Sequence, residues 1–342
     1  MKKLTVKQRK ILVICVAAVV LAAMLGTFVG LFVTARLYID LDTINPVNGN
    51  VILMTDNETG AKALAKVDGN GAITDEEFKI LVFTDLHFGN YKINRNKKTM
   101  DLMLRNIERE KPDLVILTGD IILSSFSKNR VKTFAEVMEK TNVFWAYVLG
   151  NHESDGSFTY KRDEYPEVLS QYPHCLMPAG QRKLNDGTEV WGNGNYYVNI
   201  LGSEGNVRQT LFLMDSGNLA SKADRKKLGL PKGSYDFIKD SQIKWYRESL
   251  ETINKDREEK APSMVFMHIP LVEYDISYKE ALAGGEALLT YGAQLEPVYA
   301  SDYNSGLFDA LVAGGSTKAV FAGHDHVNNS RVLYKGIMLC YV

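Results

Sequence analysis

The segment KAVFAGHDH, residues 318–326, joins a short apolar run to a glycine and to two histidines two positions apart. The same order, an apolar run followed at once by polar residues, occurs earlier in the chain. The earlier examples are KILVFTDLH (79–87), DLVILTGD (113–120), VFWAYVLGNHE (143–153) and SMVFMH (263–268). This repeated pattern determines how the rest of the sequence is interpreted.

Apolar runs of this length, rich in Val, Ile and Phe, are typical of strands that are buried on both faces. TLFLM (210–214) is a further run of this kind. Between the runs lie helical patterns with apolar residues at i, i+3, i+4 and i+7, at 100–107 and 243–250. Alternating strands and helices predict a layered α/β domain over residues 79–342. The stretch 154–209 is polar and aromatic with weak periodicity, which predicts long loops near the site.

The polar clusters share one expected position, because ligands of open α/β sheets bind beyond the carboxyl ends of the strands. The chain has six histidines, and five of them fall in these clusters. That enrichment favours one common site over a series of unrelated turns. The sixth, His174, is expected to be structural or exposed. Glu153 and Asp325 lie beside candidate ligands and are expected to accept hydrogen bonds rather than bind metal.

The candidate ligands are carboxylates, an amide and imidazoles, without a thiolate, which suits Mn, Fe or Zn. They are Asp85, His87, Asp120, Asn151, His268, His324 and His326. Such a set is too large for one ion and fits two ions, divalent or trivalent, that share a bridging carboxylate. Paired ions of this kind stabilise the attacking and leaving oxygens of a displacement at phosphorus, and they acidify a water molecule between them.

The block order DLH, GD, GNHE, H and GHDH resembles that of the calcineurin-like metallophosphoesterase superfamily. Further segments resemble its purple-acid-phosphatase-related and Dcr2-type phosphatases. They are KPDLVILTGD, WAYVLGNHES, LFLMDSGN, YDFIKDSQIKWY, HIPLVEY and NSGLFDALVAGGSTKAVFAGHDH. The likeness covers residues 78–342. It implies a four-layer α/β/β/α sandwich, in which two packed mixed β-sheets are flanked by helices.

The resemblance also implies a role for each candidate residue. The first metal would be held by Asp85, His87 and His326. The second would be held by Asn151, His268 and His324, with Asp120 bridging both. His152 would steady and protonate the leaving oxygen, since its ordinary pKa lies near working pH. The implied reaction is phosphoester hydrolysis by direct in-line attack of a metal-bridging hydroxide, without a phosphoenzyme.

Three departures from the family pattern matter. Leu123 stands where purple acid phosphatases have a tyrosine, so a tyrosinate-coloured ferric site is not expected. Residues 121–125 read IILSS where phosphoprotein phosphatases have Asp-Arg-Gly, so the sequence names no carboxylate to orient His152. The chain ends at Val342 within GIMLCYV, which reads as a strand. Relatives continue further, so the resemblance implies a truncated or unusually short domain.

Residues 11–34 contain no charged side chain, and this run exceeds the about 20 residues that cross a bilayer. Several cations precede it, and fewer charges follow it. The preceding cations are Lys2, Lys3, Lys7, Arg9 and Lys10, and the following charges are Arg36, Asp40 and Asp42. This asymmetry predicts a cytoplasmic tail (1–10), a single-pass anchor (11–34) and an extracytoplasmic remainder. A cleaved signal peptide, the rival interpretation, has a shorter apolar core of about 7–15 residues.

Residues 35–78 are expected to form a connector with a hairpin. The segment DGNGAITDEEF (68–78) suggests a calcium-binding EF-hand loop, but Lys66 would occupy the position of its first carboxylate ligand. Asn70-Gly71 between apolar flanks is a hairpin signal, and we favour the hairpin.

Composition limits the remaining possibilities. A net charge of −1 predicts no binding to nucleic acid, and three cysteines, one of them within the apolar run, exclude a disulfide scaffold. The expected partners are a phosphoester substrate and a bilayer. A phosphodiesterase acting on nucleotides or lipid headgroups, and a non-catalytic surface module that binds metal or ligand, remain as alternatives. The sequence does not identify a substrate, because loops determine specificity.

Overall fold

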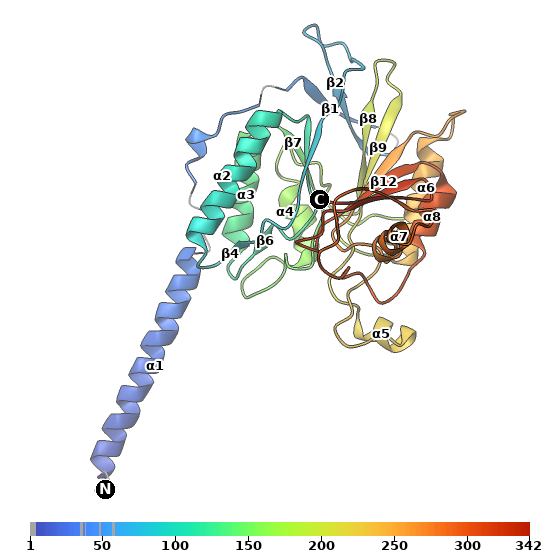
Figure 1. Ribbon diagram of the computed structural model, residues 1–342. Helices are drawn as coiled ribbons and strands as arrows, with labels where there is room; N and C mark the ends of the chain where they lie inside the picture. The colour runs from blue at the N-terminus through green and yellow to red at the C-terminus, as the bar shows by residue number, and fades with distance from the viewer. Residues whose placement is uncertain (1–4, 35–36, 38, 48, 57–58) are drawn as a thin grey trace.

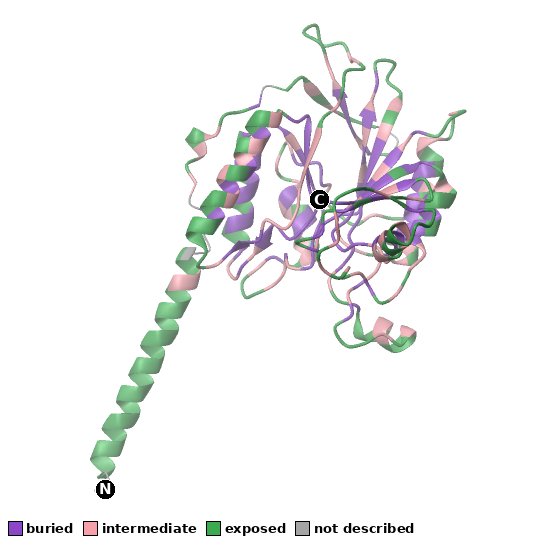
Figure 2. Cartoon of the chain, in the orientation of Figure 1, coloured by how far each residue is buried: buried purple, intermediate pink, exposed green. Residues whose placement is uncertain are grey.

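The computed structural model describes residues 5–34, 37, 39–47, 49–56 and 59–342. Lys2, Lys3 and Arg36, which contribute to the charge asymmetry around the apolar run, lie outside these residues. Helix α1 (Val6–Thr34) projects away from the remainder of the chain (Figure 1). Its side chains are exposed along most of its length, whereas many strands of the following domain are buried (Figure 2).

The domain that follows α1 is built on a large sheet and a small one. The large sheet has the order β1 (Val51–Thr55), β2 (Lys62–Lys66), β8 (Tyr196–Leu201), β9 (Val207–Leu213), β10 (Ser263–Phe266), β12 (Thr317–Ala322), β14 (Ile337–Tyr341), β13 (Arg331–Tyr334) and β11 (Leu288–Tyr291). It is mixed, with β9, β10, β12 and β14 parallel to one another. The small sheet contains β3 (Ile80–Phe83), β5 (Leu114–Leu117) and β7 (Phe144–Tyr147), all parallel. A short pair, β4 (Phe88–Gly89) and β6 (Ile122–Leu123), lies beside it.

Helices cover the outer faces of the two sheets (Figure 1). The helices after α1 are α2 (Ile93–Glu110), α3 (Lys128–Lys140), α4 (Tyr165–Leu169), α5 (Lys222–Leu228), α6 (Asp240–Ile253), α7 (Glu273–Leu282) and α8 (Leu307–Gly314), with 3₁₀ turns η1 (Leu41–Thr43) and η2 (Arg162–Glu164). Of these, α5 protrudes from the domain and has no buried residue. Helix α2 forms because Met100, Met103 and Ile107 share one buried face. It ends at Lys111, whose φ of 46° is left-handed. The expected α/β fold with two sheets and helices is confirmed.

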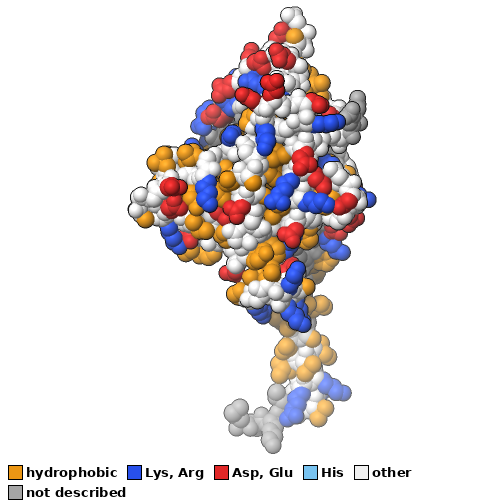
Figure 3. Space-filling model, turned by 90° about the vertical axis from the view of Figure 1, so that its right-hand side faces the viewer, with side chains coloured by type: hydrophobic (Ala, Val, Ile, Leu, Met, Phe, Trp, Pro, Cys, Tyr) orange, Lys and Arg blue, Asp and Glu red, His pale blue; other side chains and the backbone are white. Residues whose placement is uncertain are grey.

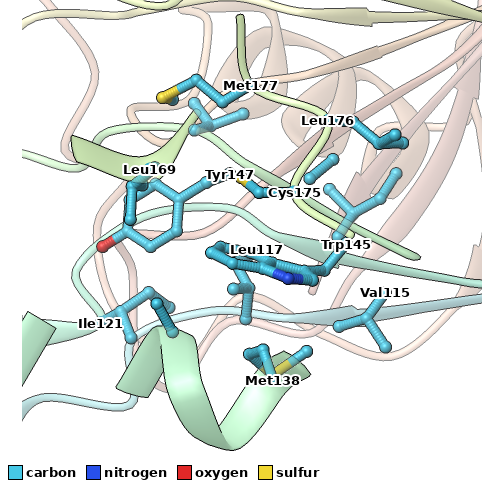
Figure 4. Close-up of a cluster of buried hydrophobic side chains, with 14 of the residues drawn as sticks. Val115, Leu117, Ile121, Met138, Trp145, Tyr147, Leu169, Cys175, Leu176 and Met177 are labelled. Carbon is cyan, nitrogen blue, oxygen red and sulfur yellow. The ribbon is translucent and has the colours of Figure 1, made fainter. Parts of the chain in front are cut away.

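One hydrophobic core fills the space between the small sheet, its helices and the large sheet. Figure 4 shows Trp145 of β7 lying among Val115, Leu117 and Met138. A second core lies on the far side of the large sheet, where Tyr246 of α6 packs with other buried side chains. Burial of a large apolar side chain contributes about 1.5–3 kcal/mol, so these two cores hold the sheet ends in fixed positions.

One part of the chain is more ordered than the sequence suggested. The stretch 154–209, expected to form long loops, contains α4 and the strand β8. In β8 the side chains of Tyr196, Val198 and Ile200 alternate inward, a period-two pattern that is too short to stand out in an aromatic segment. The connector also contributes strands, since β1 pairs with β2 and β2 pairs in parallel with β8.

The chain reverses direction in a tight turn between Val67 and Ile73. Val67 and Ile73 form an antiparallel bridge, and the turn between them contains Gly71 with a φ of 83°. Asp68 Oδ1 accepts hydrogen bonds from the backbone N–H groups of Asn70 and Ala72, so this oxygen stabilises the turn itself.

Candidate metal centre

The polar clusters that follow five strands meet where the carboxyl ends of the two sheets come together. Strands β3, β5 and β7 of the small sheet lead to Asp85, Asp120 and Asn151. Strands β10 and β12 of the large sheet lead to His268 and His324. Topology therefore explains how segments that are far apart in the sequence supply one site.

One group of candidate ligands consists of Asp85, His87 and His326. Asp85 Oδ1 lies 3.3 Å from His326 Nε2 and 3.4 Å from His87 Nε2. The two imidazole nitrogens lie 3.1 Å apart. His87 is buried and His326 is exposed, so this group lies at the open side of the site.

The second group surrounds the buried ring of His268. Its Nε2 lies 3.2 Å from Asp120 Oδ2, 3.0 Å from Asn151 Oδ1 and 3.3 Å from His324 Nδ1. Its other nitrogen, Nδ1, lies 2.9 Å from the carbonyl oxygen of Thr118. A proton on Nδ1 donated to that carbonyl leaves the Nε2 lone pair directed into the group, which is the arrangement of a metal-binding histidine.

Asp120 lies between the two groups. Its Oδ2 is 3.2 Å from His268 Nε2 in one group and 3.8 Å from His87 Nε2 in the other. Its Oδ1 accepts a hydrogen bond of 2.8 Å from the backbone N–H of His152. The carboxylate is therefore held in one orientation between the two groups of candidate ligands.

The donor atoms fit metal ions. With ligand distances of about 2.0–2.2 Å, neighbouring ligand atoms around an ion are about 3.0–3.5 Å apart, as found in both groups. Asp85 Oδ1 is buried and has no hydrogen-bond partner among the described residues, an arrangement that is costly unless a cation lies beside it. The donors are oxygen and nitrogen atoms, which suit Mn, Fe or Zn.

The glycines of the clusters are required by close packing. A methyl group on Gly150 would overlap Asp120 Oδ1, and one on Gly323 would overlap Thr84 Oγ1 and come within 2.7 Å of Asp85 Oδ2. Any larger residue at either position displaces a candidate ligand. This explains why the polar residues after β7 and β12 begin with glycine.

Several candidate ligands have a left-handed backbone conformation, which is rare for residues other than glycine. The φ angles are 53° at Asp85, 48° at His87, 53° at Asp120 and 74° at His324. Each such residue costs about 1–3 kcal/mol and persists only where the surrounding structure enforces it. The fold therefore stores strain at the candidate metal centre, which no pattern in the sequence indicates.

The charges of the buried groups influence one another strongly. Burial lowers the pKa of His268, but the Asp120 and Asp85 carboxylates outweigh burial and raise it to about 9. Burial and the charge of His268 lower the pKa of His324 to about 4. Burial, with repulsion from Asp120, raises the pKa of Glu153 to about 8. These carboxylates therefore favour a positive charge in their midst.

His152 lies beside both groups but belongs to neither. Its Nε2 is 4.0 Å from Asp120 Oδ2, and its Nδ1 lies 2.5 Å from Asp155 Oδ2. The side chain is 37% exposed, so a substrate could reach it. Asp155 is the carboxylate that orients His152. The sequence did not identify it, because the family pattern places such a carboxylate shortly after Asp120, whereas Asp155 stands three residues after His152.

A second partnership that was missed holds the loop of Asn151. Arg162 donates to the carbonyl oxygen of Gly150 and, at 2.5 Å, to Asp215 Oδ1. Both side chains are largely buried. Asp215 also accepts a hydrogen bond from the backbone N–H of Asn193. Sequence spacing offered no signal for this pair, since 53 residues separate its members.

Other expectations for single residues are confirmed. Glu153 Oε1 accepts hydrogen bonds from the backbone N–H of Ile121 and from Tyr147 Oη. Asp325 Oδ2 accepts one from Tyr341 Oη, so both acids act as acceptors. His174 lies away from the site, 2.8 Å from Glu139 Oε2, in a structural role.

The chain is similar to several known proteins. Residues 78–328 match the family model described as calcineurin-like phosphoesterase. The chain is 31% identical to probable inactive purple acid phosphatase 29 of Arabidopsis thaliana, over 78% of this chain and 71% of that protein. It is also 31% identical to the phosphatase DCR2 of Saccharomyces cerevisiae, over 80% of this chain and 47% of that protein.

Among solved structures, a dimetal phosphatase from Danio rerio matches 78% of this chain and 87% of its own, with 17% identity and a TM-score of 0.49. The family match spans most of the chain and contains all five polar clusters. The chain therefore belongs to the calcineurin-like phosphoesterase family, and its relatives include purple-acid-phosphatase-like proteins and the yeast phosphatase.

Proposed function

We propose that the protein is a membrane-anchored phosphatase that depends on two metal ions. The observation that carries the proposal is the meeting of seven candidate ligands in two adjoining groups, with Asp120 between them. Asp85, His87 and His326 would hold one ion, and Asn151, His268 and His324 the other. When bound, such ions acidify a water molecule and stabilise the charge that develops at phosphorus.

The side chains of the protein would then perform three tasks. Asp120 is held by the backbone N–H of His152, which fixes the carboxylate in one orientation. Asp155 holds His152 Nδ1, so that Nε2 faces the site and can give a proton to the leaving oxygen. Arg162 fixes the carbonyl of Gly150 and with it the position of Asn151.

The plant relatives are named probable inactive purple acid phosphatases, which raises the alternative that this chain binds metal without catalysis. Three features favour activity. Every candidate ligand is present, His152 is in place, and Asp155 lies at hydrogen-bond distance from it. A non-catalytic module has no need of a supported proton donor, so the site is better suited to turnover.

The anchoring part of the proposal rests on α1. It is long and apolar enough to cross a membrane, with a mean hydropathy of 2.8 and no buried part in its most apolar window. The cations before it favour a cytoplasmic N-terminus and an extracytoplasmic catalytic domain. Hydrogen bonds between α1 and the catalytic domain, described below, support an anchor that is retained rather than cleaved.

The test is hydrolysis of an aryl phosphate by the full-length protein loaded with Mn²⁺ or Zn²⁺. The variant Asp120→Asn should lose at least about 100-fold of the activity, since it removes the shared anionic ligand. The exposed Asp256→Asn serves as a matched control and should keep the full rate. An active Asp120→Asn protein, or an inactive wild type with two bound ions, would reject the proposal. Comparing the rate on the aryl phosphate with the rate on a bis-aryl diester distinguishes a phosphatase from a phosphodiesterase.

A further inference from the structure

The last turns of α1 make specific contacts with the catalytic domain. Tyr91 Oη donates a hydrogen bond to the carbonyl oxygen of Thr27, and Asn90 Nδ2 donates one to that of Leu31, both at 3.2 Å. The ring of Tyr91 also packs over Gly30, where a β-carbon would come within 3.1 Å of its hydroxyl. The domain is therefore fixed to the end of the helix rather than tethered to it loosely.

Aromatic rings extend this contact sideways. Phe126 lies edge-on to Phe28 and Phe32 of α1, with ring centroids 5.2 and 6.2 Å apart. On its other side Phe126 stacks against Phe158, with centroids 4.7 Å apart. The outer residues remain open, because Phe158 is 67% exposed and Tyr91 is 58% exposed. Tyr91, Phe126 and Phe158 together are called the aromatic platform below.

The position of these contacts along α1 determines their depth relative to a bilayer. The charge-free run begins at Ile11, and about 20 helical residues span the hydrocarbon core, so the outer boundary falls near Gly30. The platform touches α1 between Thr27 and Phe32, at that boundary. Aromatic side chains are enriched at this level, where their rings can lie among the headgroups.

Each platform residue belongs to a loop that starts at the candidate metal centre. Tyr91 follows His87 by four positions, and Phe126 and Phe158 follow Asp120 and His152 by six. A chain of six residues spans at most about 21 Å, so the centre lies within that reach of the platform. The bilayer and the candidate active site are thus neighbours.

The backbone of the platform residues is strained. The φ angles of Tyr91, Phe126 and Phe158 are 57°, 57° and 58°, a left-handed conformation that bulky side chains rarely adopt. The hydrogen bond from Phe126 N–H to the Ser157 carbonyl oxygen, 2.7 Å long, ties two of the loops together. Strain of this kind at functional sites is maintained by the surrounding structure, and here it holds Phe126 against α1 while Tyr91 and Phe158 stay exposed.

The charge next to the platform suits an anionic surface. Residues 88–100 contain four cations and no acidic side chain, and the cations are Lys92, Arg95, Lys97 and Lys98. They lie in the first turns of α2, where cations oppose the helix dipole, and the structure records no ion pair for them among the described residues. The basic helix α5 lies at the same end of the domain, and Lys, Arg and hydrophobic side chains gather there (Figures 1 and 3).

We propose that the aromatic platform rests in the headgroup layer beside α1, so that the metal centre acts on phosphoesters presented at the bilayer surface. The part that concerns substrates rests on the proposed phosphatase function, whereas the docking itself does not. The partner is a lipid surface that contains anionic headgroups, which the cations of residues 92–98 would attract.

Docking can be tested without catalysis. The variants Phe158→Trp and Tyr91→Trp of the full chain would be placed in vesicles of phosphatidylcholine and phosphatidylserine with brominated acyl chains. Compared with the wild type, each variant should show additional tryptophan fluorescence that is blue-shifted. The bromine atoms should quench most of this additional fluorescence. The matched control is Leu282→Trp, whose indole should not be quenched. Leu282 is 65% exposed and belongs to α7, which lies far from α1 in Figure 1.

Unquenched indoles at both 91 and 158 would overturn the docking. The two probes lie in separate loops, so misfolding of one variant would not explain a loss of quenching in both. The substrate class is tested by comparing hydrolysis of phosphatidic acid in vesicles with that of a soluble aryl phosphate. The double variant Tyr91→Ser/Phe158→Ser should lower the ratio of these rates about tenfold. An unchanged ratio would reject the substrate class. A wild type that hydrolyses neither compound, with quenching intact, would reject the phosphatase function alone.

Discussion

His152 Nδ1 lies 2.5 Å from Asp155 Oδ2, and this carboxylate fixes the orientation of the one histidine of the site that is not a candidate ligand. The two residues share one loop, three positions apart. The pair supplies what the sequence had left open, because no Asp-Arg-Gly segment follows Asp120.

Asp155→Asn should slow the hydrolysis of phenyl phosphate about tenfold or more while slowing that of a nitrophenyl phosphate less. A poor leaving group depends on proton donation, whereas a good one does not. The dependence of kcat on the leaving group is the measurement, with the exposed Asp163→Asn as control. Equal losses on both substrates would show that Asp155 acts on the fold and not through His152.

Arg162→Ala should destabilise the domain by about 3–5 kcal/mol, because it leaves the buried carboxylate of Asp215 without its cation. Arg208→Ala removes a solvent-exposed partner of Asp75 and should cost less than about 1 kcal/mol. Denaturant unfolding of the two variants beside the wild type measures both costs. If both variants lost less than about 1 kcal/mol of unfolding free energy, Arg162 would not hold the loop of Gly150.

Gly150→Ala should displace Asp120 and lower the number of bound metal ions per chain, because the added methyl group overlaps the carboxylate. Gly69→Ala is the matched control, since no atom lies within 4 Å of the new methyl group there. Elemental analysis of the purified proteins gives the metal content. Full metal content in Gly150→Ala would show that the close approach at Gly150 is unnecessary.

Metal binding should strengthen as pH rises towards 9. The carboxylates raise the pKa of His268 to about 9 in spite of its burial, so at pH 7 its Nε2 must lose a proton before it can bind an ion. Affinity should rise about tenfold per pH unit for one displaced proton and level off above about pH 9. Titrating the metal-free protein with Mn²⁺ at several pH values tests this. His174→Gln should keep the slope, and a flat profile in the wild type would contradict the assignment.

The raised pKa of His268 also affects the stability of the metal-free protein, which should fall, whereas metal affinity rises, as the pH increases. A pKa above the ordinary value of 6.5 stabilises the metal-free fold fully below pH 6.5, and this contribution is lost as pH rises through about 9. Urea unfolding of the metal-free protein at pH 6 and pH 9 should show the decrease. His268→Gln should reduce that difference.

The sequence predicted the α/β fold and the strands that lead to the site because each strand is a continuous apolar run bounded by polar residues. KAVFA and DLVILT became β12 and β5 with boundaries shifted by only a residue. Strand β8 escaped prediction because its inward residues alternate over a short segment, and because one of its two neighbours, β2, comes from a distant part of the sequence.

The candidate ligands were predicted for a similar reason, since strand order brings the carboxyl ends together and each cluster carries its own signal. Pairs such as Arg162 and Asp215 have no such signal, because only the folded chain brings them into contact. Left-handed backbone at Asp85 or Asp120 is likewise a result of tertiary packing, which local sequence preference does not express. The limits 1–10, 11–34, 35–78 and 79–342 of the chain's parts stay predictions.

The most direct test of the account is anomalous diffraction from crystals of the protein grown with Mn²⁺. We expect two manganese peaks about 3.5–4 Å apart. One should lie among Asp85, His87 and His326, the other among Asn151, His268 and His324, and Asp120 should touch both. A single peak, or peaks that lie away from Asp120, would contradict the dinuclear site on which the proposed function depends.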